Sequence, residues 1–406
     1  MTAFRKETPP LLVPSPDEKG GGGAVTSSLK NLGSAGPADS TLRYVANTSL
    51  FQDLVLTAAR APGVRWELGG NAAVMASRFA KEGWQPLLGS QVSPQLQSMV
   101  PPRVHLSGPQ VARDDVHLLL EYPSGASWGP FSAPRANRFI IHSDHQNPLL
   151  ISLENFAERL SGWEPHLVVV GGLQMLDNFP LPPAVRKDRL DRLRHMLVQQ
   201  HAPVHFEMAS FTDVSLMQAI TDSLLPHTDS LGMNEQELPN LHNLVVYGNV
   251  SLVAESTPRV APVLDQMREL FAALNKRTAS VSGSKRLTRL HVHTLAFQAI
   301  LTSKDSPWRN TKNAAAKAAL TANRHTCGTR HVDPSRSRIL LDDSFTTSLD
   351  PKLARKIPFS QEDPVTCWEE DQDLGFCLAP VLVCTDVLQT GGGGDNVSSA
   401  GLVLQI

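Results

Sequence analysis

The sequence predicts an α/β fold in which helices cover both faces of a doubly wound, parallel sheet and a smaller lobe lies beside it. Apolar runs of strand length alternate with longer amphipathic stretches along the chain. Strands separated by helices of that length form βαβ units and therefore run parallel. The length of 406 residues suits one large α/β domain with an added lobe as well as two or three domains.

The predicted elements follow in order along the chain. Residues 1–41 are rich in Pro, Gly and Ser and hold few large apolar side chains, so we expect disorder there and folded structure from Leu42 onward, beginning with a helical pattern that reaches Ala59. The expected strands are Val116–Tyr122, Arg138–His142, His166–Val170, Val204–Phe206, Leu290–His293 and Val381–Cys384. The expected helices are Ser152–Ser161, Pro183–Gln200, Asp213–Leu225, Arg259–Lys276, Asn313–Ala322 and Asn396–Leu404.

Charge and composition exclude several classes of partner. The 37 Lys and Arg residues balance 39 Asp and Glu residues, so the chain lacks the basic surface that nucleic acid or an anionic membrane requires. No apolar run is long enough to span a membrane, and residues 1–24 lack the apolar core of a secretory signal. The sequence therefore predicts a cytoplasmic protein with a small-molecule substrate.

The four cysteines have no metal-binding spacing and are expected to be thiols, with one disulfide in the last quarter left open.

The clearest candidate for a catalytic segment is Gly391–Gly394 followed by Asp395, between the last expected strand and helix. Glycines at such a junction let backbone N–H groups converge on a phosphate, and the helix N-terminus adds partial positive charge. Asp395 in the first helical turn would stand where phosphoryl transfer needs a general base. The alternative is a flexible linker with an ordinary N-cap, which is what Gly20–Gly23 resembles, since no strand precedes it and no helix follows it.

Two further acidic positions suit a magnesium ion. Glu207 ends an apolar strand, and Asn234 and Glu237 are one helical turn apart at an expected helix start. Mg²⁺ in phosphoryl transfer is held by one or two carboxylates together with water and phosphate oxygens. A capping box or solvated carboxylates would give the same pattern.

Taken together, these motifs resemble those of ribokinase-like sugar kinases, and within them the animal branch of the ADP-dependent glucokinases. The similarity extends over about residues 42–406. The segments that carry it are Gly69–Ala73, His117–Tyr122, Ala136–Ile140, Pro165–Leu173, Leu231–Glu237, Arg289–Leu295 and the Gly391–Asp395 loop. The resemblance implies a large doubly wound domain, about 146–406, and a lid formed mainly by about 60–145.

The resemblance also implies roles for single residues. Asp395 would be the catalytic base, and the metal-binding set would be Glu207, Glu237 and Asp395. The phosphates of the nucleotide would meet Arg138, Gly392, Gly393, Gly394 and His293, and the sugar would meet Gly69, Gly70, Asn71 and His117. His291 and His293 lie two residues apart on one strand face, a spacing that suits either two metal ligands or a purely structural role.

The implied reaction moves the β-phosphoryl group of ADP to the 6-hydroxyl of D-glucose, giving glucose 6-phosphate and AMP in glycolysis, with Mg²⁺ and a monomeric enzyme. Family members begin with a strand that carries a sugar-binding Asn and Asp, which residues 1–40 do not reproduce. Loss of that strand would leave neighbouring strands with exposed edges. Two alternatives therefore stay open: a non-catalytic nucleotide-binding isoform, and an ATP-using sugar kinase of the same fold. Relatives are associated with the endoplasmic reticulum, whereas this sequence shows no segment for it.

Overall fold

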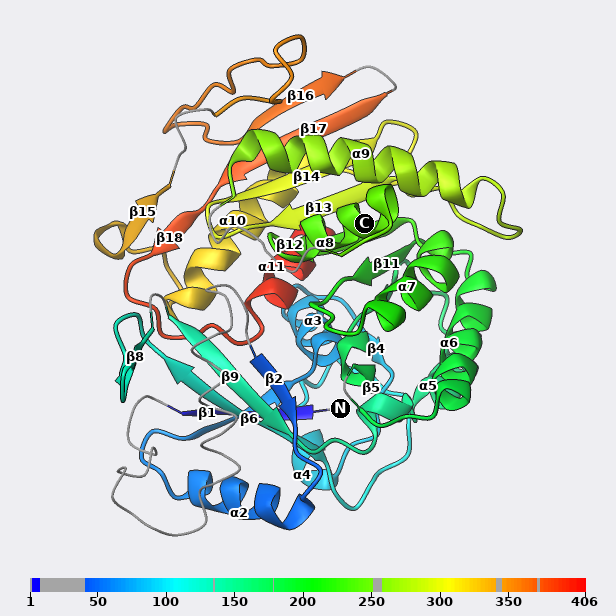
Figure 1. The fold of residues 1–406 in the computed structure, drawn as a ribbon, viewed down its shortest axis with the longest axis vertical. Coiled ribbons are helices and arrows are strands. Elements are labelled where there is room, and N and C mark those ends of the chain that lie inside the picture. Colours follow the sequence, from blue (N-terminus) through cyan, green and yellow to red (C-terminus); the bar gives the residue numbers. More distant parts are fainter. Residues whose placement is uncertain are drawn as a thin grey trace.

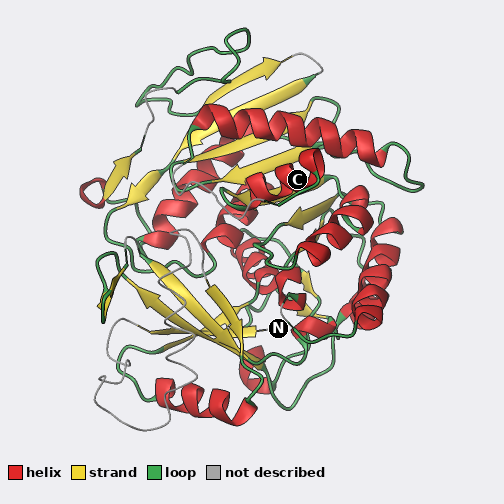
Figure 2. Ribbon diagram, in the orientation of Figure 1, coloured by secondary structure: helices red, strands yellow, loops and turns green. Residues whose placement is uncertain are grey.

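The structure is a computed structural model, and it describes residues 2–7, 41–133, 136–177, 179–250, 258–340, 345–370 and 373–406. They form two larger sheets, three two-stranded sheets and the helices around them (Figures 1 and 2). Within them, no helix is long and apolar enough to cross a membrane.

The larger sheet has seven strands in the order β10-β11-β12-β13-β14-β17-β16. The first four run parallel, as predicted, and the other three pair antiparallel. Because only three residues join β13 to β14, these strands form a hairpin and cannot run parallel. The strands are β10 Val168–Val170, β11 Val204–Glu207, β12 Ser230–Asn234, β13 Arg289–His293, β14 Phe297–Ser303, β17 Leu374–Pro380 and β16 Thr366–Glu370.

Amphipathic helices cover this sheet. In α9 the buried side chains Val260, Val263, Leu264, Met267, Leu270 and Phe271 recur every three or four residues, so one face of the helix packs on the core. Helix α9 crosses in front of β13 and β14 in Figure 1 and packs on α8, whereas α10 packs on α11. The helices are α5 Leu153–Leu160, α6 Pro183–Val198, α7 Val214–Ser223, α8 Glu237–Tyr247, α9 Val260–Thr278, α10 Thr311–Thr326 and α11 Gly393–Val403.

The smaller sheet forms the lobe and has five strands in the order β2-β9-β6-β1-β3. Its strands are β1 Thr2–Glu7, β2 Thr41–Tyr44, β3 Arg65–Gly69, β6 Asp115–Tyr122 and β9 Asn137–His142. The longer helices beside it are α2 Thr48–Ala59 and α3 Asn71–Lys81. The short elements are β4 Leu87–Leu88, α4 Pro94–Gln97, β5 His105–Leu106, β7 Ser127–Trp128 and β8 Phe131–Ser132.

The N-terminal residues differ from the expectation of disorder over residues 1–41. Strand β1 lies between β6 and β3, parallel to the first and antiparallel to the second. Strand β1 therefore gives β6 and β3 a hydrogen-bonded neighbour, although its sequence holds neither Asn nor Asp. Residues 8–40 lie outside the described residues.

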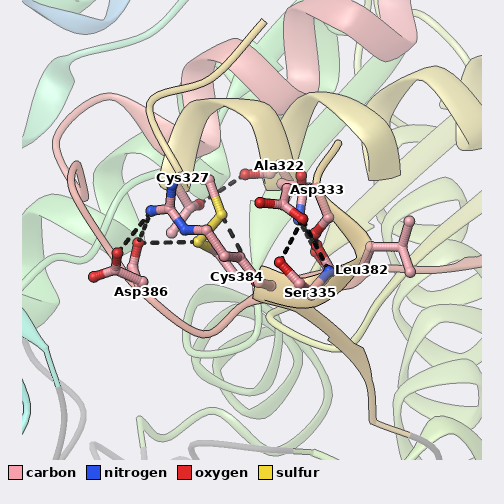
Figure 3. The surroundings of a disulfide bond; sticks show 11 residues. Ala322, Cys327, Asp333, Ser335, Leu382, Cys384 and Asp386 are labelled. Atoms are coloured by element: carbon pink, nitrogen blue, oxygen red, sulfur yellow. Dashed lines mark hydrogen bonds and ion pairs between the residues drawn. A yellow bond between two sulfur atoms is a disulfide. The ribbon is translucent and has the colours of Figure 1, made fainter. Parts of the chain in front are cut away.

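The cysteines form two disulfides, so the expectation of thiols is wrong. Cys367 pairs with Cys377 across β16 and β17, where the strand register places the two residues opposite each other. Cys327 at the end of α10 pairs with Cys384 in β18 Leu382–Cys384 (Figure 3). Strand β18, predicted as part of the main sheet, instead pairs with β15 Ser337–Ile339.

The core of the large sheet should dominate stability. Leu290 in β13 is fully buried, whereas Leu320 on α10 keeps 38% of its surface exposed. Leu290→Ala removes packing atoms and leaves a cavity, so it should lower the free energy of unfolding by about 2–5 kcal/mol in urea denaturation. Leu320→Ala is the matched control and should stay within about 0.5 kcal/mol of wild type. Equal effects of the two substitutions would contradict this description of the core.

Candidate functional site

A cavity of about 810 Å³ lies where the two sheets meet. Most of the predicted site residues line it, although they come from segments far apart in the sequence: Gly69, Gly70, Asn71, His117, Arg138, Glu237, His293, Gly393 and Gly394. Three predicted residues do not line the cavity but contact residues that do. Glu207 is hydrogen-bonded to His293, Asp395 is hydrogen-bonded to Asn71, and Gly392 precedes Gly393 in the chain. The structure therefore brings all the predicted residues to one place.

The glycine loop leads directly into the first turn of α11. Gly392 is the N-cap and has φ 68°, a left-handed conformation that favours glycine. No side chain caps this helix start, so the first backbone N–H groups of α11 are available to an anion at the cavity. At Gly394 a Cβ atom would lie 3.0 Å from the ring of His293, so a side chain would displace that histidine.

Asp395 is held by Asn71 at the start of α3, the helix that packs on α11. Its Oδ1 accepts a hydrogen bond from Asn71 Nδ2 at 2.9 Å, and Asn71 Oδ1 in turn accepts from Gln174 Nε2 at 2.8 Å. Burial and the nearby charge of Glu207 raise the pKa of Asp395 to about 7, against the opposing effect of the Asn71 hydrogen bond. A carboxyl group with that pKa can accept a proton near neutral pH.

Glu207 is buried at the end of β11, and three protein donors bind its carboxylate. Oε2 accepts from His205 Nε2 at 2.9 Å and from Ser398 Oγ at 2.6 Å, and Oε1 accepts from His293 Nε2 at 3.1 Å. Burial alone would raise the pKa of Glu207, but the hydrogen bonds from the two histidines hold it below the ordinary value. Glu207 is therefore an anion in the interior.

A second buried charge, that of Arg289, is connected to the Glu207 carboxylate through Ser230 and His205. Arg289 Nη1 donates to Ser230 Oγ at 3.0 Å, and Ser230 Oγ lies 2.8 Å from His205 Nδ1. Because His205 Nε2 must donate to the ionised Glu207, Nδ1 of the neutral ring accepts the Ser230 proton. Sequence reasoning missed His205, Ser230, Arg289 and Ser398, since no local motif marks them.

His293 and His291 have different surroundings on β13. His293 lines the cavity, and although burial would lower its pKa, the bond to Glu207 raises that pKa above the ordinary value. His291 is fully buried beside Gly401 and its Nε2 lies 3.1 Å from Gln298 Oε1. The structure thus gives His291 a place in the core and His293 a place at the cavity.

The donor set around Glu237 fits a magnesium ion. Asn234 binds the Glu237 carboxylate through its backbone N and its Nδ2, each at 2.9 Å. Burial, with Glu207 and Glu235 nearby, raises the pKa of Glu237 to about 7. A divalent cation beside this group would replace its proton and neutralise the local excess of carboxylates, which are the ligands that Mg²⁺ prefers. Glu207 likewise has hydrogen-bond donors on both of its oxygens, but two of these donors are histidines and its pKa is lowered instead of raised.

Arg138 lies where the lobe meets the glycine loop. Its Nη1 donates to the carbonyl of Thr390 at 3.3 Å. Glu121 lies opposite Arg138 in the strand register. Its Oε1 accepts hydrogen bonds from Thr390 N at 2.8 Å, from Thr390 Oγ1 at 2.7 Å and from Gly391 N at 3.1 Å. Glu121 was not predicted as a site residue, yet it fixes the loop that precedes Asp395.

The residues predicted to contact the sugar also line the cavity: Gly69, Gly70, Asn71 and His117. Gly69 ends β3, and Gly70 has φ 85° and turns the chain so that Asn71 begins α3. His117 is almost fully buried, and its Nε2 binds both carboxylate oxygens of Asp144, at 2.9 and 3.0 Å. Asp144 is a second residue that the sequence did not indicate.

The disulfide between Cys327 and Cys384 supports the opposite wall of the cavity (Figure 3). Beyond it, the carbonyl of Thr326 accepts from Leu388 N and Gln389 N, and His325 Nε2 lies 2.7 Å from the carbonyl of Gly391. The C-terminal end of α10 therefore holds the segment that leads into the glycine loop.

The raised pKa of Asp395 has a consequence for stability. The folded chain binds this proton more tightly than the unfolded chain does, because the ordinary pKa of 3.8 rises to about 7. Relative to Asp395→Asn, wild type should therefore lose at least about 1 kcal/mol of unfolding free energy as the pH rises from about 4 to 7. Urea denaturation of both proteins at several pH values measures the difference. A difference that does not depend on pH would contradict the raised pKa.

The fold and this geometry agree with known proteins. The structure is similar to a solved ADP-dependent kinase in complex with fructose-6-phosphate and ADPbetaS, with a TM-score of 0.66 and 17% sequence identity. The alignment covers 99% of this chain and 90% of that kinase. A phosphofructokinase from Pyrococcus horikoshii with AMP aligns at a TM-score of 0.56 and 16% identity, over 94% of this chain and 86% of that one. The predicted ribokinase-like α/β fold is confirmed.

Sequence comparison adds the family. Residues 34–404 match the ADP-specific phosphofructokinase/glucokinase conserved region. An ADP-dependent glucokinase of Bos taurus is 33% identical over 89% of this chain and 72% of its own length, and a probable ADP-dependent glucokinase of Caenorhabditis elegans is 29% identical over 89% and 73%. The prediction of a phosphotransferase is thereby confirmed at the level of family. With most of its length matched in this way, the chain belongs to the ADP-specific phosphofructokinase/glucokinase family.

Proposed function

We propose that this kinase transfers the β-phosphoryl group of ADP to the 6-hydroxyl of D-glucose, producing glucose 6-phosphate and AMP. The observation that carries the proposal is the position of Asp395, a carboxyl group with a pKa of about 7 at the start of a glycine-capped helix beside a cavity of about 810 Å³. The names of the bovine and nematode relatives support ADP and glucose as the substrates.

In this proposal Asp395 takes the proton of the sugar hydroxyl as the oxygen attacks phosphorus, and AMP leaves with the electron pair of the broken P–O bond. Asn71 orients the base through its bond to Oδ1. Asn71, with Gly69, Gly70 and His117, also belongs to the sugar side of the cavity wall.

The phosphate side is formed by the first turn of α11 and two cations. The backbone amides of Gly392, Gly393 and Gly394 bind the phosphoryl oxygens, where the helix dipole favours negative charge. Arg138 and His293 add positive charge from the lobe and the large sheet respectively. Bound Mg²⁺ would neutralise phosphate charge, with Glu237 as its carboxylate ligand and with Glu207 and Asp395 adding negative charge around it.

Two alternative functions differ from this proposal in the phosphoryl donor or in having no catalytic activity. A non-catalytic nucleotide-binding protein is suggested by the sequence of β1, which lacks Asn and Asp. An ATP-using sugar kinase of the same fold would need the same base and glycine loop. We expect a monomer in each case.

The decisive experiment compares glucose 6-phosphate formation from ADP and from ATP by the purified full chain with Mg²⁺. Product from ADP is expected, and Asp395→Asn should lower kcat by roughly 100-fold or more while the nucleotide still binds, because general-base assistance is worth at least that factor. If glucose 6-phosphate formed from ATP and not from ADP, the phosphoryl donor would be ATP and the proposal of ADP would be wrong. Nucleotide binding without turnover would favour the non-catalytic alternative.

The same base predicts a pH profile. Since Asp395 must be ionised to accept a proton, and its pKa is about 7, kcat/KM should rise from pH 5.5 to about 7.5 and then level off. The residual activity of Asp395→Asn should lack this rise. A wild-type profile that is flat over this range would rule out Asp395 as the titrating base.

A further inference from the structure

The lobe contains a buried cluster of ligating side chains that the proposed reaction does not use as a group. It consists of His117 in β6, His142 in β9 and Asp144 just after β9, with exposed fractions of 4%, 1% and 0%. His117 and His142 are opposite each other in the strand register, with ring centroids 5.0 Å apart. One nitrogen from each histidine and one oxygen of Asp144 all lie within 4.8 Å of one another.

One atom of this cluster is unsatisfied. His142 Nδ1 is buried and makes no hydrogen bond, although it lies only 3.3 Å from Asp144 Oδ1. A buried ring nitrogen without a partner costs free energy, so a cation beside both atoms would remove that cost.

We propose that His117 Nε2, His142 Nδ1 and Asp144 form a binding site for a divalent first-row transition ion of the zinc type. Two imidazole nitrogens and one carboxylate oxygen are a ligand set that such ions favour, whereas Mg²⁺ favours oxygen ligands. Ligand atoms about 2.0–2.2 Å from a tetrahedral ion lie about 3.3 Å from one another. The separation of 3.3 Å between His142 Nδ1 and Asp144 Oδ1 matches this spacing. His117 Nε2, now 2.9 Å from that oxygen in a hydrogen bond, would move apart from it by about half an ångström when an ion replaced the shared proton.

The surroundings of the cluster are those of a supported metal site. Asn147 Nδ2 donates to Asp144 Oδ2 at 2.6 Å and so fixes the carboxylate, as outer residues of metal sites do. The ring of Tyr44 packs edge-on against His142 with centroids 5.6 Å apart. Of the three ligands, His117 also lines the main cavity, so the cluster lies next to solvent-accessible space. An ion held here would tie β6, β9 and the segment after β9 together.

The test is metal binding by the full chain, which requires no turnover. The protein is stripped with a chelator and titrated with Co²⁺ in excess Mg²⁺, so that carboxylate sites are filled, and the visible absorption of bound Co²⁺ is recorded. Wild type should bind one equivalent with an intense visible band. His142→Gln and Asp144→Asn should each weaken binding by about 100-fold or more, since even the loss of an outer residue costs about 10–100-fold. His145→Gln removes an exposed neighbouring imidazole and is the matched control.

The expected control result is a His145→Gln protein that binds Co²⁺ as wild type does. The proposal is overturned if wild type shows no stoichiometric band, or if folded His142→Gln binds as tightly as wild type. Should neither cluster variant fold, crystals of wild type soaked in Zn²⁺ decide the question by anomalous scattering. A peak within about 2.3 Å of the three ligand atoms supports the site, and its absence there overturns it.

Discussion

The site depends on keeping one carboxylate, that of Glu207, ionised inside the protein. Burying an unpaired anion would cost several kcal/mol, and here His205, His293 and Ser398 all donate to it. Arg289 adds a buried positive charge and sets the orientation of His205 through Ser230. With Glu207 anionic, His293 gains a proton more readily, and Asp395, whose pKa is raised first by burial, loses its proton still less readily.

Close packing around this carboxylate also explains small residues in the neighbourhood. A Cβ atom on Gly232 in β12 would overlap the Glu207 carboxylate, and one on Gly394 would press on His293. Glycine at these positions therefore reflects contact with the buried network. At Gly392, by contrast, the reason is the backbone conformation, because its φ of 68° lies in the left-handed region.

The second constraint is the junction between the lobe and the large sheet. Asn71 from α3 binds Asp395 from α11, and Glu121 from β6 binds the loop at Thr390 and Gly391. Each contact places a residue of the lobe on the segment that carries the proposed base. Asn71 and Glu121 therefore fix the position of this segment from two different elements.

The sequence by itself determined the features that local patterns encode. It marked β6, β9, β11 and the helices α5, α6, α7, α9 and α11 within a few residues, because the burial of one face sets the spacing of apolar side chains. It also marked Asp395 as a candidate base, since a strand, a glycine run and a helix follow one another in this part of the chain.

Only the tertiary structure decided what lies far apart in sequence. Asn71 and Asp395 are 324 residues apart, and nothing near Ser230, Asp144 or Ser398 indicates that they bind ionisable partners. The antiparallel half of the large sheet and the two disulfides likewise depend on which strands become neighbours. Local sequence fixes the conformational preference of each segment, whereas the pairing of buried charges and strands follows from long-range packing, which no local pattern records.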